Sequence, residues 1–580
     1  MRRILSLLAA TTCLAPVAQA ATIMPLGRAT ILAGSSFDAK VEFDKVVKAD
    51  DVVITINGAP AADVLGQPIV FIEKEDGVEA SAVRINGAAI AKPGSYTVEA
   101  KAGDETATVT WEVYGTPETP VAKNVIFMIA DGLSVADRTA ARLMSKGMTE
   151  GKANGRLNLD DLTNMAFVGT SSTNAIATDS ANTASAYMTG HKTAVNALGV
   201  YADRTPDTQD DPKVELISEA LARTGDKAVG IVSTAEVEDA TPASLIAHTR
   251  KRADKQAIAD MLFEHQPEVI LGGGSAYFLP QSTPGSKRKD DENLVQKFQD
   301  AGYALATDAT GLAATAGSNS GKILGLFHTG NMDVALDRKF LKKGTVEKFP
   351  DQPGLVDMTE VALSQLSKNP DGFFVMIEGA SVDKQKHTMD WERAMFDMIE
   401  FDQAVGVAKA FVAENPDTLL IVTGDHTHGN SLIGSIDPSR GVGRESVGVY
   451  ADAGFLGYKD ENGDGFPDSV DVAPRIAMFA NNFPDYYETW GPKMNGPFEP
   501  AVQNENKEYV ANAEYKDVPG ATFREGNLPK SADTAVHAVD DIVLQASGAG
   551  ADQFHGYMEQ SDVYATVAKI LALAPSKPSN

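Results

Sequence analysis

From about residue 121 onward, short runs of apolar and β-branched residues recur along the chain, and polar turn residues bound each run. Such runs are typical of buried strands in a parallel sheet. Three of the runs lead into a carboxylate. They are Val125–Ala130 before Asp131, Phe373–Ile377 before Glu378, and Leu419–Gly424 before Asp425. The pattern predicts three strands that bring acids to one edge of a sheet.

Helical patterns separate these runs from further ones. Additional apolar runs occupy Val229–Val232, Val269–Leu271 and Ile323–Phe327, and Arg393–Val412 carries apolar residues on or near one helical face. This alternation predicts an α/β domain over residues 121–580, with a doubly wound, mostly parallel sheet flanked by helices.

The acids at the strand ends point to chemistry as well as fold. In open α/β sheets, ligands bind beyond the carboxyl ends of the strands. Three carboxylates gathered there would repel one another unless a cation neutralised them. The pattern therefore favours a metal site at this edge.

Residues 21–116 have a different pattern, in which apolar residues alternate with period two. The segments Asp51–Asn57, Ser95–Ala100 and Thr106–Tyr114 are separated by Gly, Pro and Asp turns. This pattern predicts a small all-β sandwich of the immunoglobulin-like kind, which precedes the α/β domain. Residues 117–120 (PETP) would link the two.

The segment between His426 and His537 has a third kind of sequence pattern. Asp485–Phe523 is rich in aromatic residues, Pro and Asn, and it has no clear periodicity. We expect an insertion at about residues 431–530 that folds over or beside the active site, because its aromatic residues require burial.

The first twenty residues resemble a secretory signal. Arg2 and Arg3 precede an apolar stretch too short to span a membrane, and Ala18–Ala20 fits a small-residue cleavage site. A buried N-terminal helix is the alternative. We expect a secreted protein, periplasmic or extracellular, without a membrane span. Cys13 is the only cysteine and lies in this segment, so we expect neither a disulfide nor a thiolate metal site in the mature chain.

The chain of 580 residues has a formal net charge of −28. Such a field repels polyanions, so nucleic acid is not an expected partner. A solubilising surface accounts for most of the acids.

Ser180 begins a segment of small residues that ends at Gly190. A serine at a helix N-terminus presents its hydroxyl beside free backbone N–H groups, an arrangement that suits phosphate. The alternative is that Ser180 is only an N-cap.

The histidines favour the functional alternative. His387 follows Asp383 by four residues, so both would project from one helical face. His426 adjoins Asp425, and His428 and His537 follow. Carboxylate and imidazole without thiolate are the ligands of a catalytic zinc site.

Several stretches together resemble the metal-dependent alkaline phosphatases of bacteria and animals. They are Asn124–Gly132, Thr178–Ser180, Val232–Arg252, Val269–Gly274, Gly325–Met332, Phe373–His387 and Val422–His428, together with His537. The resemblance extends from about Ala122 to Leu573, apart from the insertion. It implies hydrolysis of small phosphate monoesters through a phosphoserine. It also suggests that the protein forms a homodimer.

The resemblance also implies a role for each matching residue. Ser180 would be the nucleophile, and Arg252 would bind two phosphate oxygens. Two zinc ions and one magnesium ion would share the remaining residues: Asp383, His387 and His537 for one zinc, Asp131, Asp425 and His426 for the other, and Asp131, Thr241 and Glu378 for magnesium.

Three further residues would support the site from behind the ligands: Asp239, Lys384 and His428. Asp239 has the alternative of a helix cap before Pro242, and Lys384 that of a solvated side chain. Asn182 and Thr183 depart from the smaller residues usual in the family, which affects the packing behind Ser180.

An acidic loop in the insertion resembles an EF-hand-type calcium loop. Oxygen-bearing side chains and one glycine take the corresponding positions: Asp460, Asn462, Asp464, Gly465, Asp468 and Asp471. A plain acidic turn is the alternative, since the last position is Asp in place of Glu.

These features predict a secreted phosphomonoesterase. A phosphodiesterase or sulfatase on the same scaffold is the alternative enzyme, and a metal-binding surface or adhesion protein is the non-enzymatic one.

Overall fold

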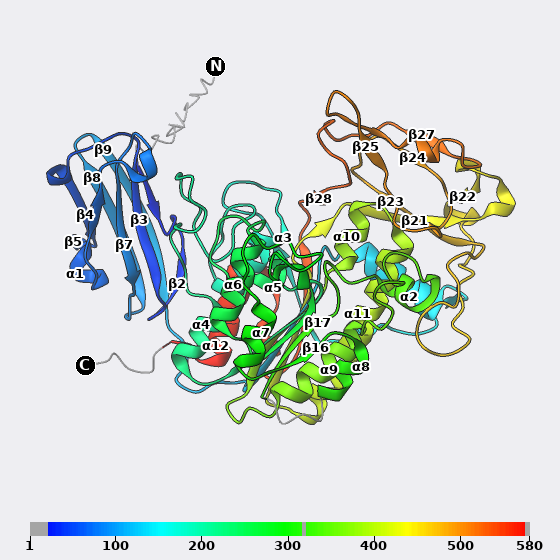
Figure 1. Ribbon diagram of the computed structural model, residues 1–580, viewed down its shortest axis with the longest axis horizontal. Helices are drawn as coiled ribbons and strands as arrows, with labels where there is room; N and C mark the ends of the chain where they lie inside the picture. The colour runs from blue at the N-terminus through cyan, green and yellow to red at the C-terminus, as the bar shows by residue number, and fades with distance from the viewer. Residues whose placement is uncertain (1–20, 316–320, 575–580) are drawn as a thin grey trace, which may run out of the picture.

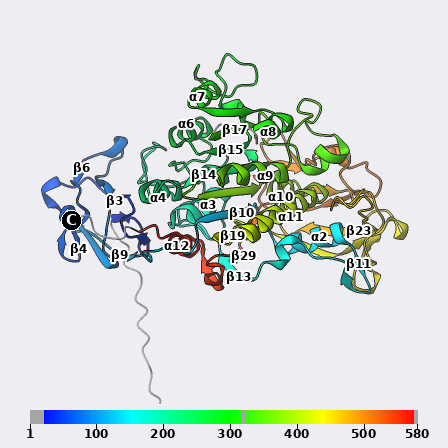
Figure 2. The same cartoon turned by 90° about the horizontal axis from the view of Figure 1, so that it is seen from below.

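The computed structural model describes residues 21–315 and 321–574, so the predicted signal segment lies outside the described residues. A β-sandwich lies at one end of the molecule, a large α/β body in the middle, and the insertion at the other end (Figures 1 and 2). The predicted fold class, an α/β domain preceded by a small all-β domain, is confirmed.

A ten-stranded sheet forms the centre of the α/β body, in the order β16-β17-β15-β14-β18-β10-β19-β29-β13-β30. Every pairing is parallel except those of β29 with β19 and β13. The strands are β10 (Asn124–Ala130), β13 (Asn164–Gly169), β14 (Ala228–Glu236), β15 (Val269–Gly273), β16 (Tyr303–Ala306), β17 (Lys322–Leu326), β18 (Phe373–Gly379), β19 (Thr418–Thr423), β29 (Ile542–Gly548) and β30 (Gly556–Glu559).

Helices cover both faces of this sheet, so the central strands are buried on both sides. In β10, Phe127 packs into one hydrophobic cluster and its neighbour Met128 into the other. This explains why the strand is apolar throughout. The helices of the body are α2 (Val135–Lys146), α3 (Ser180–Thr189), α4 (Ile217–Thr224), α5 (Ala240–Ala243), α6 (Lys255–His265), α7 (Leu294–Asp300), α8 (Ala309–Thr315), α9 (Leu355–Leu366), α10 (Ser381–His387), α11 (Trp391–Glu414) and α12 (Gln560–Leu571).

Two sheets with a shared core form the N-terminal domain. One contains β1 (Ala21–Met24), β3 (Phe37–Phe43), β6 (Val70–Ile72) and β7 (Ala82–Ala88), and the other contains β2 (Thr30–Leu32), β4 (Val52–Ile56), β5 (Ala59–Pro60), β8 (Gly94–Ala102) and β9 (Glu105–Tyr114), with α1 (Ala61–Leu65) nearby. Trp111 from one sheet meets Phe37 from the other edge-to-face, with ring centroids 5.6 Å apart. The alternating pattern therefore buries one face of each sheet.

The insertion consists of small sheets and loops. Its strands are β21 (Asn430–Ile436), β22 (Val447–Gly448), β23 (Arg475–Ala480), β24 (Tyr486–Glu488), β25 (Ala501–Gln503), β26 (Tyr509–Ala511) and β27 (Thr522–Arg524). Tyr486 and Phe498 are buried in a cluster of their own with Met389, which follows α10. The aromatic residues are thus packed against the body. None of the helices in residues 21–315 and 321–574 has the length and apolar character that crossing a bilayer requires.

Candidate metal centre and active site

The three strand-end acids lie at one edge of the central sheet because their strands are neighbours. β10 lies between β18 and β19, and Ile129 of β10 is opposite Glu378 on one side and Thr423 on the other. Asp131 follows β10 directly, and Asp425 comes two residues after β19. The parallel register alone therefore gathers three buried carboxylates at the carboxyl ends of the strands.

Gly132 allows the chain to turn directly after Asp131. Its φ is +70°, a conformation that favours glycine, and a Cβ there would lie 2.8 Å from Asp383 Oδ1. Its N–H donates to Asp425 Oδ1 at 2.9 Å. The glycine lets two carboxylates approach the same backbone segment.

The first group of possible metal ligands contains Asp383, His387, His428 and His537, whose ligand atoms all lie within 4.8 Å of one another. Nε2 of His387 is 3.2 Å from Asp383 Oδ2, across one turn of α10. His428 on β20 (Thr427–His428) pairs with His537 on β28 (His537–Ala538). Helix spacing supplies two of the ligands and a short β-bridge supplies the others.

His428 was predicted to support the site from behind the metal ligands, but its imidazole lies among the possible ligands themselves. Its Nε2 is 2.9 Å from Asp383 Oδ1, whereas Nε2 of His537 is 3.5 Å from the same oxygen. The imidazole of His428 is in reach either to bind a cation or to orient Asp383.

The second group contains Asp131, Asp425 and His426. Nε2 of His426 is 3.2 Å from Asp131 Oδ1 and 3.4 Å from Asp425 Oδ2. Ser180 Oγ lies 3.2 Å from the same nitrogen and 3.4 Å from both oxygens of Asp131. The serine hydroxyl therefore points into the centre of this group.

Ser180 is the first residue of α3, and its N-cap is Asp179, whose carboxylate accepts from Asn182 N at 3.2 Å. The alternative that Ser180 is only an N-cap is wrong. Its hydroxyl is directed at the possible metal ligands, and Asp179 caps the helix instead.

Glu378 and Thr241, the other two predicted magnesium ligands, are both buried, and Glu378 lies opposite Ile129, two residues before Asp131. Glu378 Oε2 accepts a hydrogen bond from Ser233 Oγ, and Thr241 Oγ1 is buried without a hydrogen-bond partner. Burial, with the charge of Asp131 added, raises the pKa of Glu378 to about 8. Ser233 had no role in the sequence prediction, because only the strand register reveals that it lies in β14 opposite Glu378.

The donor set fits divalent cations. Several buried polar atoms make no well-oriented hydrogen bond within the protein, and these include Asp383 Oδ1 and His428 Nε2 despite their separation of 2.9 Å: Thr241 Oγ1, Asp383 Oδ1, Asp425 Oδ2, His426 Nδ1 and His428 Nε2. Without a cation, burial and the charge of Asp131 raise the pKa of Asp425 to about 7. Cations would supply both the missing partners and the missing charge.

Arg252 is held between two carboxylates beside the serine. Nη1 is 3.2 Å from Asp179 Oδ2, and Nη2 is 3.2 Å from Asp239 Oδ1. Burial favours the neutral guanidine, but the charges of Asp239 and Asp179 outweigh it and raise the pKa of Arg252. The guanidinium stays charged, and each terminal nitrogen keeps a second N–H for an anion.

Asp239 is also paired with Lys384, whose Nζ is 2.7 Å from Asp239 Oδ2. Burial would raise the pKa of Asp239, but Lys384 and Arg252 outweigh it and lower this pKa. Asp239 occupies the N-cap position of α5, yet its side chain caps no backbone N–H. Asp239 thus takes the cap position while its carboxylate pairs with Arg252 and Lys384, and the alternative of a solvated Lys384 is wrong.

Lys386 is a further residue that the sequence reasoning missed. Its buried Nζ lies 2.7 Å from Asp137 Oδ2 and donates to the carbonyl of Gly132. It ties α10, which carries two possible metal ligands, to the turn after Asp131. Its position between Asp383 and His387 was the only signal, because a lysine at such a place is usually solvated.

The predicted calcium loop lies elsewhere, in the insertion. Its side chains cap the loop's own backbone: Asp460 Oδ2 accepts from Gly465 N at 2.9 Å, and Asp464 Oδ1 accepts from Phe466 N at 2.9 Å. Among the described residues, its acids do not form a group with three ligand atoms within 4.8 Å. Calcium binding stays a prediction; a higher melting temperature on adding Ca²⁺ to the zinc-loaded protein would support it.

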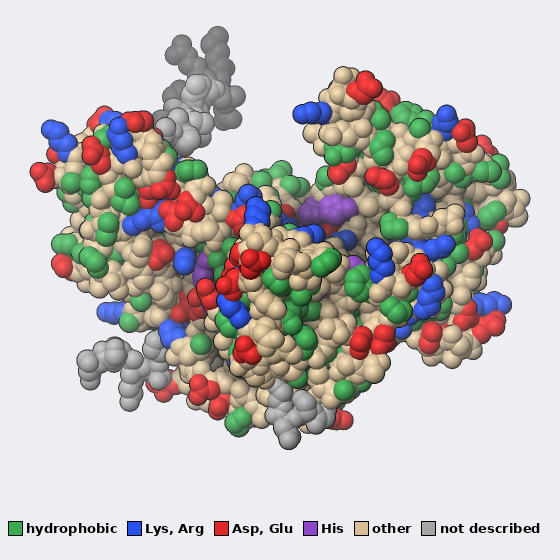
Figure 3. All heavy atoms as spheres, viewed as in Figure 1, with side chains coloured by type: hydrophobic (Ala, Val, Ile, Leu, Met, Phe, Trp, Pro, Cys, Tyr) green, Lys and Arg blue, Asp and Glu red, His purple; other side chains and the backbone are tan. Residues whose placement is uncertain are grey.

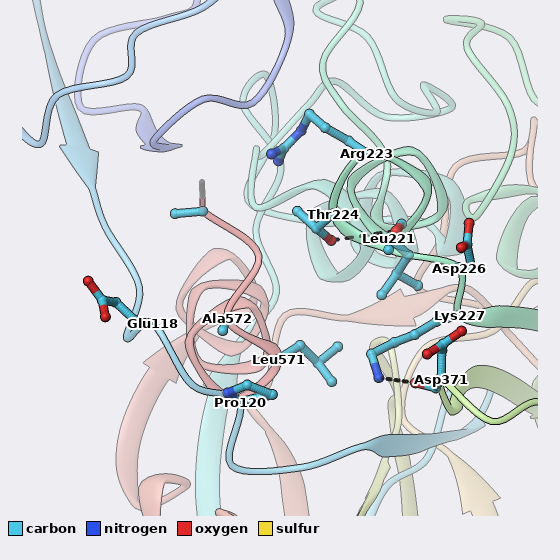
Figure 4. A pocket seen from close by; sticks show the side chains of 12 residues that line it. Glu118, Pro120, Leu221, Arg223, Thr224, Asp226, Lys227, Asp371, Leu571 and Ala572 are labelled. Carbon is cyan, nitrogen blue, oxygen red and sulfur yellow. Dashed lines mark hydrogen bonds between the residues drawn. The ribbon is translucent and has the colours of Figure 1, made fainter. Parts of the chain in front are cut away.

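Histidine side chains gather in a hollow between the α/β body and the insertion (Figure 3). A cavity of about 660 Å³ lies at the amino ends of the strands, opposite to the end that carries the acids, where Lys227 and Asp371 precede β14 and β18 (Figure 4). There Lys227 Nζ donates to the carbonyl of Asp371 at 2.6 Å. This cavity is remote from the possible metal ligands.

Comparisons with known proteins agree with this geometry. A family model described as alkaline phosphatase matches residues 122–573. An alkaline phosphatase of Gadus morhua is 30% identical over 474 residues, which are 76% of this chain and 90% of the relative. One of Escherichia coli K12 is 33% identical over 369 residues, 57% of this chain and 74% of the relative. The crystal structure of Thermus thermophilus alkaline phosphatase has the same fold, with a TM-score of 0.57 at 23% identity over 80% of this chain and 94% of that one.

Proposed function

Since the chain belongs to the alkaline phosphatase family and is a phosphoric monoester hydrolase, we propose that Ser180 is its nucleophile and that hydrolysis passes through a phosphoserine. The position of Ser180 Oγ carries this proposal: it lies 3.2 Å from His426 Nε2 and 3.4 Å from Asp131, within the second group of possible metal ligands.

Divalent cations, on which the family depends, would fill the two groups. We assign one zinc to Asp383, His387 and His537, a second zinc to Asp131, Asp425 and His426, and a magnesium to Asp131, Thr241 and Glu378. When bound, these cations supply the positive charge that activates the serine oxygen and stabilises the leaving oxygen. His428 is either an additional ligand or the group that orients Asp383.

The protein's own residues bind and orient the substrate. Arg252 donates its free N–H groups to two non-bridging oxygens of the phosphoryl group, since the guanidinium fork matches that geometry. Asp179 and Asp239 fix the plane of the guanidinium from behind. The N-terminus of α3 directs the Ser180 hydroxyl toward the phosphorus.

The reaction has two displacements. Ser180 Oγ forms a bond to phosphorus while the bond to the ester oxygen breaks, and the released alkoxide takes up a proton to give the alcohol. A water molecule then attacks the phosphorus, the bond between phosphorus and Ser180 Oγ breaks, and the oxygen of the water leaves as part of the inorganic phosphate while a proton returns to Oγ. Ser180 is regenerated, so the serine acts as a covalent catalyst.

Substitution of Ser180 by alanine tests the proposal. Ser180→Ala should lose at least about a thousandfold in kcat for an aryl phosphate, with zinc content unchanged. Wild-type protein quenched with acid during turnover should carry phosphate on Ser180. Ser172→Ala, in the loop before α3, is the matched control and should keep full activity. Unreduced turnover by Ser180→Ala would exclude the phosphoserine.

The substrate class is tested by comparing one aryl group as phosphate monoester, phosphate diester and sulfate. The monoester should be preferred, because its extra negative charge complements Arg252 and the cations. Preference for the diester or the sulfate would reject the assignment. We further propose secretion to the periplasm or the medium, which N-terminal sequencing of the exported protein would test by the absence of residues 1–20.

A further inference from the structure

A cluster of buried charges fastens the N-terminal β-sandwich to the α/β body, away from the metal ligands. Lys40 of β3 is fully buried. Its Nζ lies 2.5 Å from Glu75 Oε2, 2.6 Å from Asp203 Oδ2 and 3.2 Å from Glu42 Oε1. Asp203 belongs to the other domain, in the loop between α3 and α4. The ion pair between Lys40 and Asp203 therefore bridges the two domains.

The acids of this cluster have the spacing of a metal site, since ligand atoms of Glu42, Glu75 and Asp203 lie within 4.8 Å of one another. The ammonium group of Lys40 already contacts all three carboxylates. It supplies the positive charge that a metal ion would bring. The cluster is therefore a junction between domains and not a vacant cation site.

Arg84 of β7 strengthens the same junction. Its Nη2 lies 2.6 Å from Asp210 Oδ2 and 3.2 Å from Asp203 Oδ2. From the other side, Arg204 Nη2 donates to the carbonyl of Ser81 at 2.9 Å. The backbones also meet, because Asp38 N donates to Lys213 O at 2.8 Å. The segment 203–213 is thus held along its length by the sandwich (Figure 1).

The segment just before Asp203 is hydrogen-bonded to the stretch of chain that carries Arg252. Leu198 and Thr249 exchange backbone hydrogen bonds of 2.7 and 3.0 Å, and Arg252 N donates to Asn196 O at 2.9 Å. A side chain adds a second connection: Arg250 Nη1 donates to Asp203 O at 2.8 Å and to Asp203 Oδ1 at 3.2 Å. Asp203 therefore accepts hydrogen bonds from Lys40 of one domain and Arg250 of the other.

The same segment also reaches the N-terminus of α3. Asn196 N donates to Asp179 Oδ1 at 3.1 Å, and Asp179 Oδ2 is 3.2 Å from Arg252 Nη1. The segment 196–213, the Arg252 bridge, thus contacts the sandwich at one end and both Arg252 and Asp179 at the other.

We propose that the β-sandwich is a positioning element for phosphate binding. Lys40 and Arg84 act through Asp203 and the Arg252 bridge to keep the Arg252 guanidinium in register with the phosphoryl oxygens. Buried, fully paired charges resist displacement, and a bidentate contact weakens steeply when its donor shifts. The inference rests on the proposed role of Arg252 in binding phosphate.

Arg84→Gln in the full-length, metal-loaded protein tests the proposal. The substitution removes the contacts with Asp203 and Asp210, together with the one to Glu75 within the sandwich, without touching the site. We expect the KM for an aryl phosphate and the inhibition constant of inorganic phosphate to rise together, by up to about tenfold. Zinc content should not change. The control is Lys45→Gln, which breaks an exposed 2.6 Å ion pair with Asp104 within the sandwich and should leave both constants unchanged.

A double-mutant cycle separates positioning of Arg252 from general loosening of the fold. In an Arg252→Ala background, Arg84→Gln should raise KM no further, because the residue it positions is gone. An equal rise in both backgrounds, or no rise in either, would overturn the proposal. Arg204→Gln removes a different contact across the same junction and should raise KM in the same way. If Arg84→Gln lowers the melting temperature too far for assay, Arg204→Gln decides whether the junction positions Arg252.

The two proposals fail in distinguishable ways. If wild-type turnover does not depend on Ser180, the proposed mechanism fails whatever Arg84→Gln does. If turnover depends on Ser180 but Arg84→Gln leaves KM and phosphate inhibition unchanged, only the role of the sandwich is rejected. Calorimetric titration with inorganic phosphate gives a readout independent of turnover, and its dissociation constant should follow the inhibition constant.

Discussion

Ser180 Oγ lies 3.2 Å from Nε2 of His426, although 246 positions separate the two residues in the chain. The helix that begins at Ser180 and the loop that follows β19 meet because both lie at the carboxyl edge of the central sheet. A serine hydroxyl, an imidazole and the carboxylate of Asp131 therefore share one buried space.

Activity should depend on bound cations, and removing a ligand from one group should remove the cation of that group. Chelation should abolish phosphate release, and zinc with magnesium should restore it, since the buried acids need the cations. His537→Ala should lose about one zinc per chain, as measured by elemental analysis, because it removes one imidazole of the first group. His555→Ala is the control, since His555 is exposed and belongs to neither group. Full activity after thorough chelation would contradict the assignment.

Removal of the Arg252 guanidinium should weaken phosphate binding more than it slows the chemical step. Arg252→Ala should raise the inhibition constant of phosphate by about tenfold or more, and Arg252→Lys should recover only part of this, because an ammonium group lacks the planar fork. Lys251→Ala, next to it and largely exposed, is the matched control. An unchanged inhibition constant in Arg252→Ala would show that the guanidinium does not contact phosphate.

Gly132→Ala should disturb metal binding specifically. The added methyl would lie 2.8 Å from Asp383 Oδ1, at a φ of +70°. Gly151→Ala has a similar φ of +79° with nothing within 4 Å, so it reports the backbone strain alone. We expect both to lose about 1 kcal/mol of stability, but only Gly132→Ala to lose zinc affinity. Equal zinc affinity in both variants would argue against the contact with Asp383.

The stability of the α/β body should depend on pH through Asp397 of α11. Burial, with repulsion from Glu400, raises its pKa to about 8 in the folded protein, compared with about 3.9 in the unfolded chain. The folded state therefore binds more protons between these values, and stability falls as pH rises from about 4 to 8. Ionised Asp397 is then a destabilising charge.

Asp397→Asn mimics the protonated acid and should have little effect near pH 4. At pH 8 to 9 it should raise the unfolding free energy by up to about 5 kcal/mol, because about four pKa units separate the folded and unfolded states and each unit corresponds to about 1.4 kcal/mol. Denaturant unfolding of the metal-loaded protein at several pH values would measure this. Glu414→Gln, at the exposed end of the same helix, should give no pH-dependent difference. A gain that shrinks as pH rises would contradict the assignment.

Local patterns in the sequence were enough to predict the fold class and several members of the site. The apolar runs before Asp131, Glu378 and Asp425 predict strands, and the rule that parallel strands share a carboxyl edge predicts that their acids converge. The four-residue spacing of Asp383 and His387 predicts a shared helical face. These inferences succeed because they depend on periodicity within a single element.

The alternatives for Ser180, Asp239 and Lys384 could be decided only in three dimensions. Whether Ser180 caps its helix depends on Asp179 and Asn182, and whether Lys384 is solvated depends on Asp239, 145 positions away. The roles assigned to Thr241 and Arg252 came from resemblance to a family, since no local pattern marks a buried threonine or an arginine in a loop as functional.

The amino-acid sequence by itself thus determined which elements form and which acids end them, because side-chain periodicity reports burial on a strand or helix. Tertiary structure alone decided that His428 stands beside Asp383 and that Lys40 of the sandwich reaches Asp203 of the body. These contacts join residues far apart in the chain. Their free energy comes from burying and pairing charges between separate elements, and no stretch of sequence records which partner will be near.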